Sequence, residues 1–446
     1  MGLKASIHKR WVKIVGGLLY AVGRAWSRFP IVEIWSVHLG HTIFESANLL
    51  QHQPLLIFWR EPIANRWLVE KLSEGVKFPS LQKWFYKKTQ SAGSTLSQIA
   101  KIRMRNFSNQ YYLMNLGFNC LPPRLPQISF TQKEIDEAED FLNSNGLGKG
   151  KYVCFCVRDE SYYKEFKPDL HSGPAKDFEF RNAKLINYVK AGKYLKEKGI
   201  TPVLMGFSTK KIPDVFLCPA ISSEFRPWIE AYLFRECLFT VGMMTGTTLY
   251  ASLFGRPVLW SDAFWRGTPI GGRQDLVLPK KILKGMPSVS KKNKASWKEL
   301  NMKKWVKLGP PPDNDWSHFA NKGYECKACS SDEILDAVKD MQVSLQTKKM
   351  FLNQKARSLH KQFSKLHFRA SKKLGQAPTR LAPSWAEVNR KLIGSNVYEK
   401  YWLGSNDKEN MDMTELITSR QSRMMFNPKS RRSPVCHSPI IAQETR

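Results

Sequence analysis

The sequence predicts an α/β protein organised around doubly wound, parallel β-sheets. The first observation is the alternation of short apolar runs with helical segments through the second half of the chain. The second is an apolar run at residues 238–241, which leads through a Gly/Thr-rich turn into a helix at residues 249–254 and another apolar run at residues 257–260. This order forms a βαβ unit, and ligands of such units bind at the carboxyl ends of the strands.

Capping and termination signals predict the other elements of the second half. Thr131 and Glu134 have capping-box spacing, so a helix should begin there and end near Gly146. Gly199 should close another helix. The expected strands are residues 152–157 and 201–206, and the expected helices are residues 182–198, 227–236 and 330–341.

The first half of the chain carries fewer secondary-structure signals. Residues 30–37 and 54–59 are apolar runs expected to form buried strands. Between them, residues 38–41 are expected to form a tight loop, and Thr42 and Glu45 have the spacing of a capping box for a helix over residues 42–50. These elements predict a first, smaller α/β domain.

Five regions follow from these patterns. Two adjacent prolines near residue 122 mark a linker between two Rossmann-like domains. A closing helix is expected near residue 393, and the polar segment after it is expected to be disordered. The regions are residues 1–29 (basic amphipathic segment), 30–125 (first Rossmann-like domain), 126–345 (second Rossmann-like domain), 346–394 (basic segment and closing helix) and 395–446 (tail).

Charge restricts the class of partner. The chain of 446 residues has a net charge of +32, from 70 Lys and Arg against 38 Asp and Glu. Such an excess of positive charge favours binding to nucleic acid, to an anionic membrane surface or to an anionic substrate. Because no nucleic-acid-binding motif accompanies the charge, we expect no specific nucleic-acid partner.

The N-terminal segment contains an apolar stretch at residues 14–23 flanked by Lys and Arg. It is about half as long as the roughly 20 residues that a spanning helix needs. A basic helix lying on an anionic membrane surface fits this pattern, and so does an ordinary helix packed on the first domain. We expect a cytoplasmic protein that can attach peripherally to the membrane.

Metal-binding patterns are weak. The eight cysteines are spread along the chain, which is typical of reduced thiols, and Cys326 and Cys329 supply half of a zinc-ribbon spacing. Cys154 and Cys156 fit one face of a strand. Asp313 and Asp315 form a D-x-D pattern that follows no apolar strand. We therefore expect no bound metal and no cofactor.

The glycine turn is a candidate phosphate site. Main-chain amides and hydroxyls at the start of a helix attract an anion, which makes Gly242, Thr245, Gly246 and Thr247 candidate ligands. The turn contains neither GxGxxG nor GxxxxGK[ST]. Sequence pattern alone therefore gives a phosphate-binding hypothesis without a nucleotide class.

Charged and polar residues near other predicted strand ends add candidates. Arg158 ends a strand and could pair with a diphosphate, or could form a surface salt bridge. Arg181 and Asn182 begin a predicted helix, where Asn182 could simply be the N-cap. Glu230 could bind a ribose or sugar hydroxyl, or be a solvated helix charge. His41 could take a proton from an acceptor hydroxyl, or pack locally.

Together these pieces resemble a family of bacterial glycosyltransferases associated with surface-polysaccharide gene clusters, related in style to GT-B fucosyltransferases and heptosyltransferases. The resemblance covers roughly residues 31–393. It rests on Cys156-Val157-Arg158-Asp159 with Tyr162, Phe180-Arg181-Asn182 with Tyr188, Trp228 through Leu233, Gly242 through Thr247, Gly40-His41 and Asn65.

The resemblance implies a GT-B fold, with two Rossmann-like domains facing across a cleft. It implies metal-independent transfer of a sugar from a nucleotide-diphosphate donor to a hydroxyl of a glycan or lipid-linked acceptor. In that picture Arg158 and His41 are catalytic, and the donor is bound by Arg181, Asn182, Glu230, Gly242, Thr245, Gly246 and Thr247.

The sequence departs from the family pattern at three places. Cys156 stands where the family has histidine, Met243 and Met244 replace small polar residues, and Trp260-Ser261-Asp262 stands where an asparagine is usual. The departures at Cys156, Met243 and Met244 support an alternative function. The alternative is a non-catalytic, membrane-associated carbohydrate- or nucleotide-binding scaffold on a degenerate GT-B fold.

Overall fold

The computed structural model describes residues 31–34, 36, 39–50, 56–59, 63–76, 78–82, 126–158, 182–206, 212–243, 245–263, 274–285, 298–300, 304, 319, 321–346, 380–382, 384 and 388. The predicted N-terminal segment, the D-x-D pattern, Arg181, Met244 and the predicted tail lie outside these residues. No helix among the described residues is long and apolar enough to cross a bilayer.

The core of the structure is a parallel sheet of six strands in the order β11-β7-β6-β5-β3-β4. The predicted α/β class is thus confirmed. The strands are β3 (Tyr152–Cys156), β4 (Thr201–Leu204), β5 (Phe239–Gly242), β6 (Val258–Ala263), β7 (Leu276–Pro279) and β11 (Arg380–Leu381).

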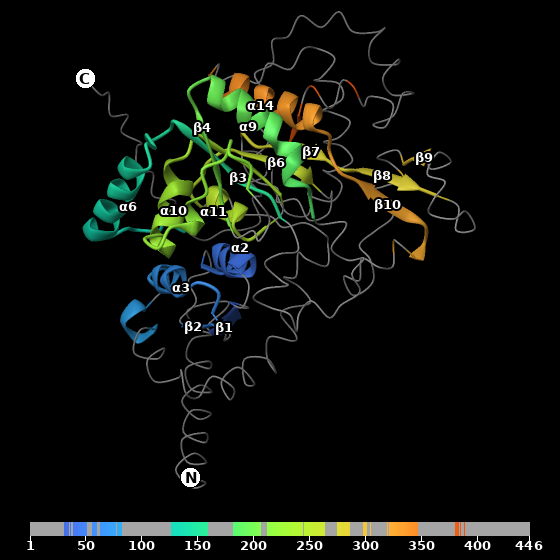
Figure 1. Cartoon of the computed structure of the whole chain (residues 1–446). Helices are drawn as coiled ribbons and strands as arrows, with labels where there is room; N and C mark the ends of the chain where they lie inside the picture. Colours follow the sequence, from blue (N-terminus) through green and yellow to red (C-terminus); the bar gives the residue numbers. More distant parts are fainter. Residues whose placement is uncertain are drawn as a thin grey trace, which may run out of the picture. The chain divides into compact units, whose positions relative to one another are not determined.

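Helices cover both faces of this sheet, as Figure 1 shows. One face packs against α6 (Gln132–Ser144), α10 (Pro227–Glu236) and α11 (Thr248–Leu253). The other packs against η3 (Leu185–Tyr188), α9 (Val189–Glu197) and α14 (Ser331–Gln346). Side chains of β3 alternate between the two cores: Cys154 enters the first and Phe155 the second, because successive strand residues point to opposite faces.

The order of the strands defines a switch point between β3 and β5. From β3 the chain moves to β4 on one side, and from β5 it moves to β6 and β7 on the other. In open α/β sheets, ligands bind outside the carboxyl ends of the strands at such a point. The topology therefore selects this edge as the place to look for a site.

The first half of the chain forms a parallel strand pair with two helices. The strands are β1 (Ile31–Ile34) and β2 (Leu56–Trp59), and the helices are α2 (Leu39–Leu50) and α3 (Arg66–Ser73). The side chain of Asn65 accepts from the amide of Leu68 as the N-cap of α3, and its Nδ2 lies 2.9 Å from the hydroxyl oxygen of Tyr250 in α11. Apolar residues of α2 and α3 share one core with α10 and α11.

Local signals placed several elements well. The capping box of Thr131 and Glu134 forms, and α10 has the predicted bounds. The predicted start of the first helix was wrong: α2 begins at Leu39, so the predicted loop over residues 38–41 is largely helical. Thr42 is no N-cap, because it lies inside the helix and its buried hydroxyl donates to the carbonyl of Ser36 at 3.5 Å.

Other elements differ from the sequence prediction or were not predicted at all. The helix predicted over residues 182–198 begins only at Leu185, as a 3₁₀ turn. A three-stranded antiparallel sheet was not predicted, nor were β7 and β11. This sheet consists of β8 (Lys281–Lys284), β9 (Lys298–Glu299) and β10 (Tyr324–Lys327), whose short, lysine-rich sequences carry little apolar signal.

Candidate functional site

The switch point brings Arg158 beside the glycine turn. Cys156 pairs with Gly242 in the register of β3 and β5, and the amide of Met243 donates to the carbonyl of Cys156 at 3.1 Å. Two residues beyond β3, the amide of Arg158 donates to the sulfur of Met243 at 3.4 Å. The side-chain nitrogens Nε and Nη2 of Arg158 are buried. A buried guanidinium at this edge places positive charge where the topology predicts a ligand.

The glycine turn packs tightly against the end of β5. A Cβ on Gly242 would lie 2.6 Å from Oγ1 of Thr248 and 3.1 Å from Cβ of Cys156, so only glycine lets α11 approach the strand this closely. The Thr245 hydroxyl accepts from the amide of Thr248 at 3.1 Å and therefore caps α11. The amides of Gly246 and Thr247 donate no hydrogen bond to the residues that the structure describes.

The start of α2 lies directly against this turn. A Cβ on Gly246 would lie 2.5 Å from the main-chain nitrogen of Gly40. The backbone of His41 follows Gly40 in α2, so the structure brings the predicted His41 element next to the predicted donor turn. The His41 side chain lies outside what the structure describes, and its role as a base stays a prediction.

Asn182 is tied to Arg158 through the backbone. The amide of Ala183 donates to the carbonyl of Arg158 at 2.9 Å. Asn182 is not an N-cap, because Lys184 occupies that position of the 3₁₀ turn. The Oδ1 atom of Asn182 is buried and accepts no hydrogen bond from any described residue. Such an acceptor is costly to leave without a partner, so a ligand that donates to it would be favoured.

Glu230 lies in the first turn of α10 and is partly buried. Burial raises the pKa of Glu230 to about 7. Its negative charge in turn contributes to the raised pKa values of Cys156 and Tyr250. No described residue forms an ion pair or hydrogen bond with its carboxylate. This burial distinguishes Glu230 from a fully solvated helix charge, and its role in binding a hydroxyl stays a prediction.

Three of the residues that depart from the family pattern are buried, namely Cys156, Met243 and Asp262. Cys156 is 2% exposed, and burial raises the pKa of its thiol, so it stays neutral near pH 7 and cannot act as a histidine would. Met243 is also 2% exposed. Asp262 lies in β6 and has a left-handed conformation, with φ of 47°, and its carboxylate accepts from the Tyr188 hydroxyl at 2.8 Å and the Cys329 amide at 2.7 Å.

Lys280 joins this edge without any signal in the sequence. It is buried at the end of β7, and its Nζ donates to the main-chain carbonyl of Asn182. A lone lysine after an unpredicted strand gives no pattern that could have identified it. The predicted half zinc-ribbon forms no site: among the described residues, no group of three or more His, Cys, Asp or Glu could hold a metal ion.

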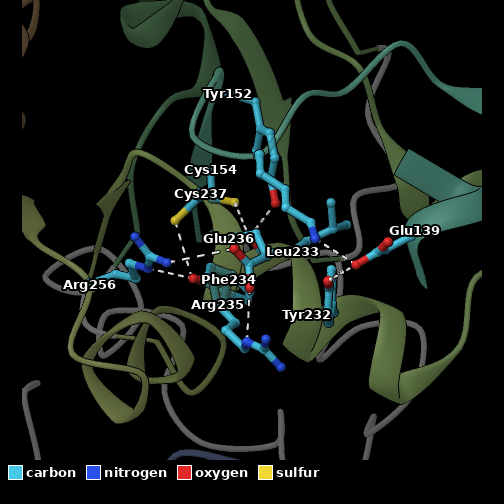
Figure 2. A network of polar contacts seen from close by, with 11 residues as sticks. Glu139, Tyr152, Cys154, Tyr232, Leu233, Phe234, Arg235, Glu236, Cys237 and Arg256 are labelled. Atoms are coloured by element: carbon cyan, nitrogen blue, oxygen red, sulfur yellow. Dashed lines mark hydrogen bonds and ion pairs between the residues drawn. The ribbon is translucent and has the colours of Figure 1, made fainter. Parts of the chain in front are cut away.

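The opposite end of the sheet holds a network of polar contacts (Figure 2). The Tyr152 hydroxyl donates to the carbonyl of Leu233 at 2.8 Å, and the Cys237 thiol donates to the carbonyl of Phe234 at 3.3 Å. The Nε of Arg256 donates to the carbonyl of Arg235. These bonds satisfy the last carbonyls of α10, which have no partner within the helix.

Two solved structures are similar to this chain. One is a glycosyl transferase family 9 protein from Veillonella parvula DSM 2008, with 13% identity, 70% of this chain and 97% of that chain covered, and a TM-score of 0.39. The other is the ADP-heptose LPS heptosyltransferase II of E. coli, with 14% identity, 58% and 92% coverage, and a TM-score of 0.35. Neither a protein-family model nor a curated protein matches the chain. At these TM-scores the two structures carry no argument about residues or substrates.

Proposed function

We propose that this chain is a GT-B glycosyltransferase, which moves a sugar from a nucleotide-diphosphate donor to a hydroxyl of a glycan or lipid-linked acceptor without a bound metal, in surface-polysaccharide synthesis. The observation that carries the proposal is the position of Arg158 and the glycine turn, side by side at the switch point of a parallel sheet. The resemblance of the same segments to a glycosyltransferase family supports it.

The donor diphosphate would lie between the glycine turn and Arg158. Main-chain amides of Gly246 and Thr247 would donate to it, while Thr245 holds the start of α11 in place. Arg158 would stabilise the negative charge that develops on the leaving diphosphate, an electrostatic role that requires no metal.

Other residues would orient the two substrates. Glu230, when ionised, would accept a hydrogen bond from a ribose or sugar hydroxyl, and Arg181 and Asn182 would bind the donor from the adjacent loop. His41 would take the proton from the acceptor hydroxyl, because α2 starts against the donor turn.

A screen of nucleotides tests the proposal. We expect GDP, UDP, ADP, CMP or one of their sugar conjugates to raise the melting temperature of the full-length protein. A ligand at 100 times its Kd adds about 2.7 kcal/mol to the free energy of unfolding, which a thermal-shift assay detects easily. If none of these compounds raises the melting temperature, the chain does not use such a donor.

Membrane attachment is a separate part of the proposal. The basic, aromatic-flanked segment at residues 1–28 would bind the cytoplasmic leaflet, where lipid-linked acceptors are made. Removing residues 1–28 should release the protein from anionic vesicles in a sedimentation assay. Vesicle binding that persists after the deletion would assign attachment to another basic region.

A second function is favoured by Cys156. Its buried, neutral thiol replaces a histidine of the family pattern, so a proton-transfer group could be missing. The chain would then be a non-catalytic scaffold that binds nucleotide or carbohydrate. Binding of a sugar nucleotide without release of nucleoside diphosphate, across a range of acceptor glycans, would identify this function.

A further inference from the structure

Lys280 is a fully buried lysine at the carboxyl edge of the sheet. It is 2% exposed, directly follows Pro279 of β7, and its main-chain amide donates to the carbonyl of Ala263 at 3.0 Å. Lysine is almost never fully buried unless it is paired. The sequence therefore retains a charged side chain at a position where an apolar one of similar volume would pack.

The contact made by Lys280 connects two strand ends to the candidate site. Its Nζ donates to the main-chain carbonyl of Asn182. The next residue, Ala183, donates from its amide to the carbonyl of Arg158 at 2.9 Å. Lys280 thus holds the segment that carries Asn182 against the end of β3, where Arg158 lies.

Among the residues that the structure describes, two cationic residues and a carboxylate lie at this edge. Asp262 is the buried carboxylate at the end of neighbouring strand β6, and its two oxygens already accept from Cys329 and Tyr188. Lys280 is buried here, and so are Nε and Nη2 of the partly exposed Arg158. The buried Oδ1 of Asn182 would accept from an O–H or N–H group of a ligand.

We propose that Lys280 is a positioning residue of the donor site, which fixes the Asn182 segment beside Arg158. This inference rests on the proposed function. A buried ionic group can often be replaced by an apolar residue of similar volume without loss of stability, so stability alone does not account for the lysine.

Three variants separate positioning from a structural role. K280M removes the cation and keeps the volume, and K280R keeps a cationic donor. K281M is the matched control, because Lys281 is the next residue and forms a 3.0 Å ion pair with Glu333 of α14. We expect isothermal titration with the best nucleoside diphosphate of the screen to give a Kd raised at least tenfold in K280M. K280R should recover part of this loss, and K281M should stay within twofold of the wild type.

A second measurement needs no ligand. Amide hydrogen exchange of residues 182–188 should be faster in K280M than in the wild type and K281M, while the melting temperature of K280M does not fall. Unchanged exchange or unchanged Kd in K280M would overturn the proposal, and so would a much lower melting temperature, which would assign Lys280 a structural role. If the wild type binds no nucleoside diphosphate, the proposed function fails, whereas exchange at residues 182–188 still decides whether Lys280 positions the segment.

Discussion

The two ends of helix α10 differ in how their polar groups are satisfied. At its C-terminal end, the carbonyls of Leu233 and Phe234 accept from Tyr152 and Cys237 in the network of Figure 2. At its N-terminal end, Glu230 is partly buried, has a pKa near 7 and has no bonded partner among the described residues. The carbonyls at one end of this helix are therefore paired, whereas the carboxylate at the other end has no partner among the described residues.

This difference extends to the whole sheet. At the carboxyl edge, Asn182 Oδ1 and the amides of Gly246 and Thr247 also have no hydrogen-bond partner in the described part of the chain. Buried polar groups without partners cost free energy, and they cluster where a ligand can satisfy them. The comparison teaches that the carbonyls at the C-terminal end of α10 are paired, whereas several polar groups at the candidate site have no partner among the described residues.

The largest expected effect comes from replacing Arg158 at the carboxyl edge of the sheet. The matched variant replaces Arg256 at the opposite end. R158A should lower kcat at least about 100-fold, because it removes the charge that stabilises the leaving diphosphate, with little change in melting temperature. R256A, at the network end, should leave kcat unchanged and lower the free energy of unfolding by about 1–2 kcal/mol, because the Arg235 carbonyl loses its partner. Steady-state kinetics and urea unfolding measure the two quantities, and equal loss of activity in both variants would erase the contrast.

A methyl group on Gly246 should also act at the site. In G246A the new Cβ would meet the main-chain nitrogen of Gly40, so α2 and the turn must move apart. We expect the Kd of the nucleotide to rise at least about tenfold, a change of about 1.4 kcal/mol. G148A is the control, since its Cβ would meet only the flexible side chain of Lys151. A nucleotide affinity in G246A equal to that in G148A would show that the contact does not shape the site.

Glu230 should make stability depend on pH. Its carboxyl has a pKa of about 7 when folded, against 4.5 ordinarily, so the folded state binds the proton more tightly between these values. The free energy of unfolding should therefore fall as pH rises from about 4.5 to 7, by on the order of 3 kcal/mol. E230Q should lack this fall and be more stable than the wild type at pH 8, as measured by urea unfolding. Parallel pH profiles for the two proteins would show that Glu230 does not titrate in this range.

The smallest expected effect lies in the network of Figure 2. Y152F removes the hydroxyl that donates to Leu233, which should lower the free energy of unfolding by about 1 kcal/mol and leave nucleotide binding unchanged. Y194F removes a hydroxyl on the partly exposed face of α9 and serves as the control. Weakened nucleotide binding in Y152F would show that the network end contributes to the site.

Much of the fold could be predicted because the signals are local. The capping box of Thr131, the proline that starts α10 and the five apolar residues of β3 lie within single turns or strands, so neighbouring residues decide them. The start of α2 could not be predicted in this way. Its first turn is fixed by contact between Gly40 and Gly246, about 200 residues apart in the sequence.

The candidate site shows the same division. Arg158, Glu230 and the glycine turn were identified from their places after or before apolar runs, and their roles in catalysis and donor binding stay predictions. The burial that raises the pKa of Glu230, and the bond from Lys280 to Asn182, depend on strands and helices packed from distant parts of the chain. No local pattern carries such information.

The sequence by itself determined the α/β class and the residues at the ends of β3 and β5, because apolar alternation and glycine turns are read from neighbours. Only the tertiary structure decided the order of the strands, which placed the switch point between β3 and β5. It also decided which polar groups are buried from water without a hydrogen-bond partner. Both depend on long-range strand pairing and helix packing, which set the burial and electrostatics of each group.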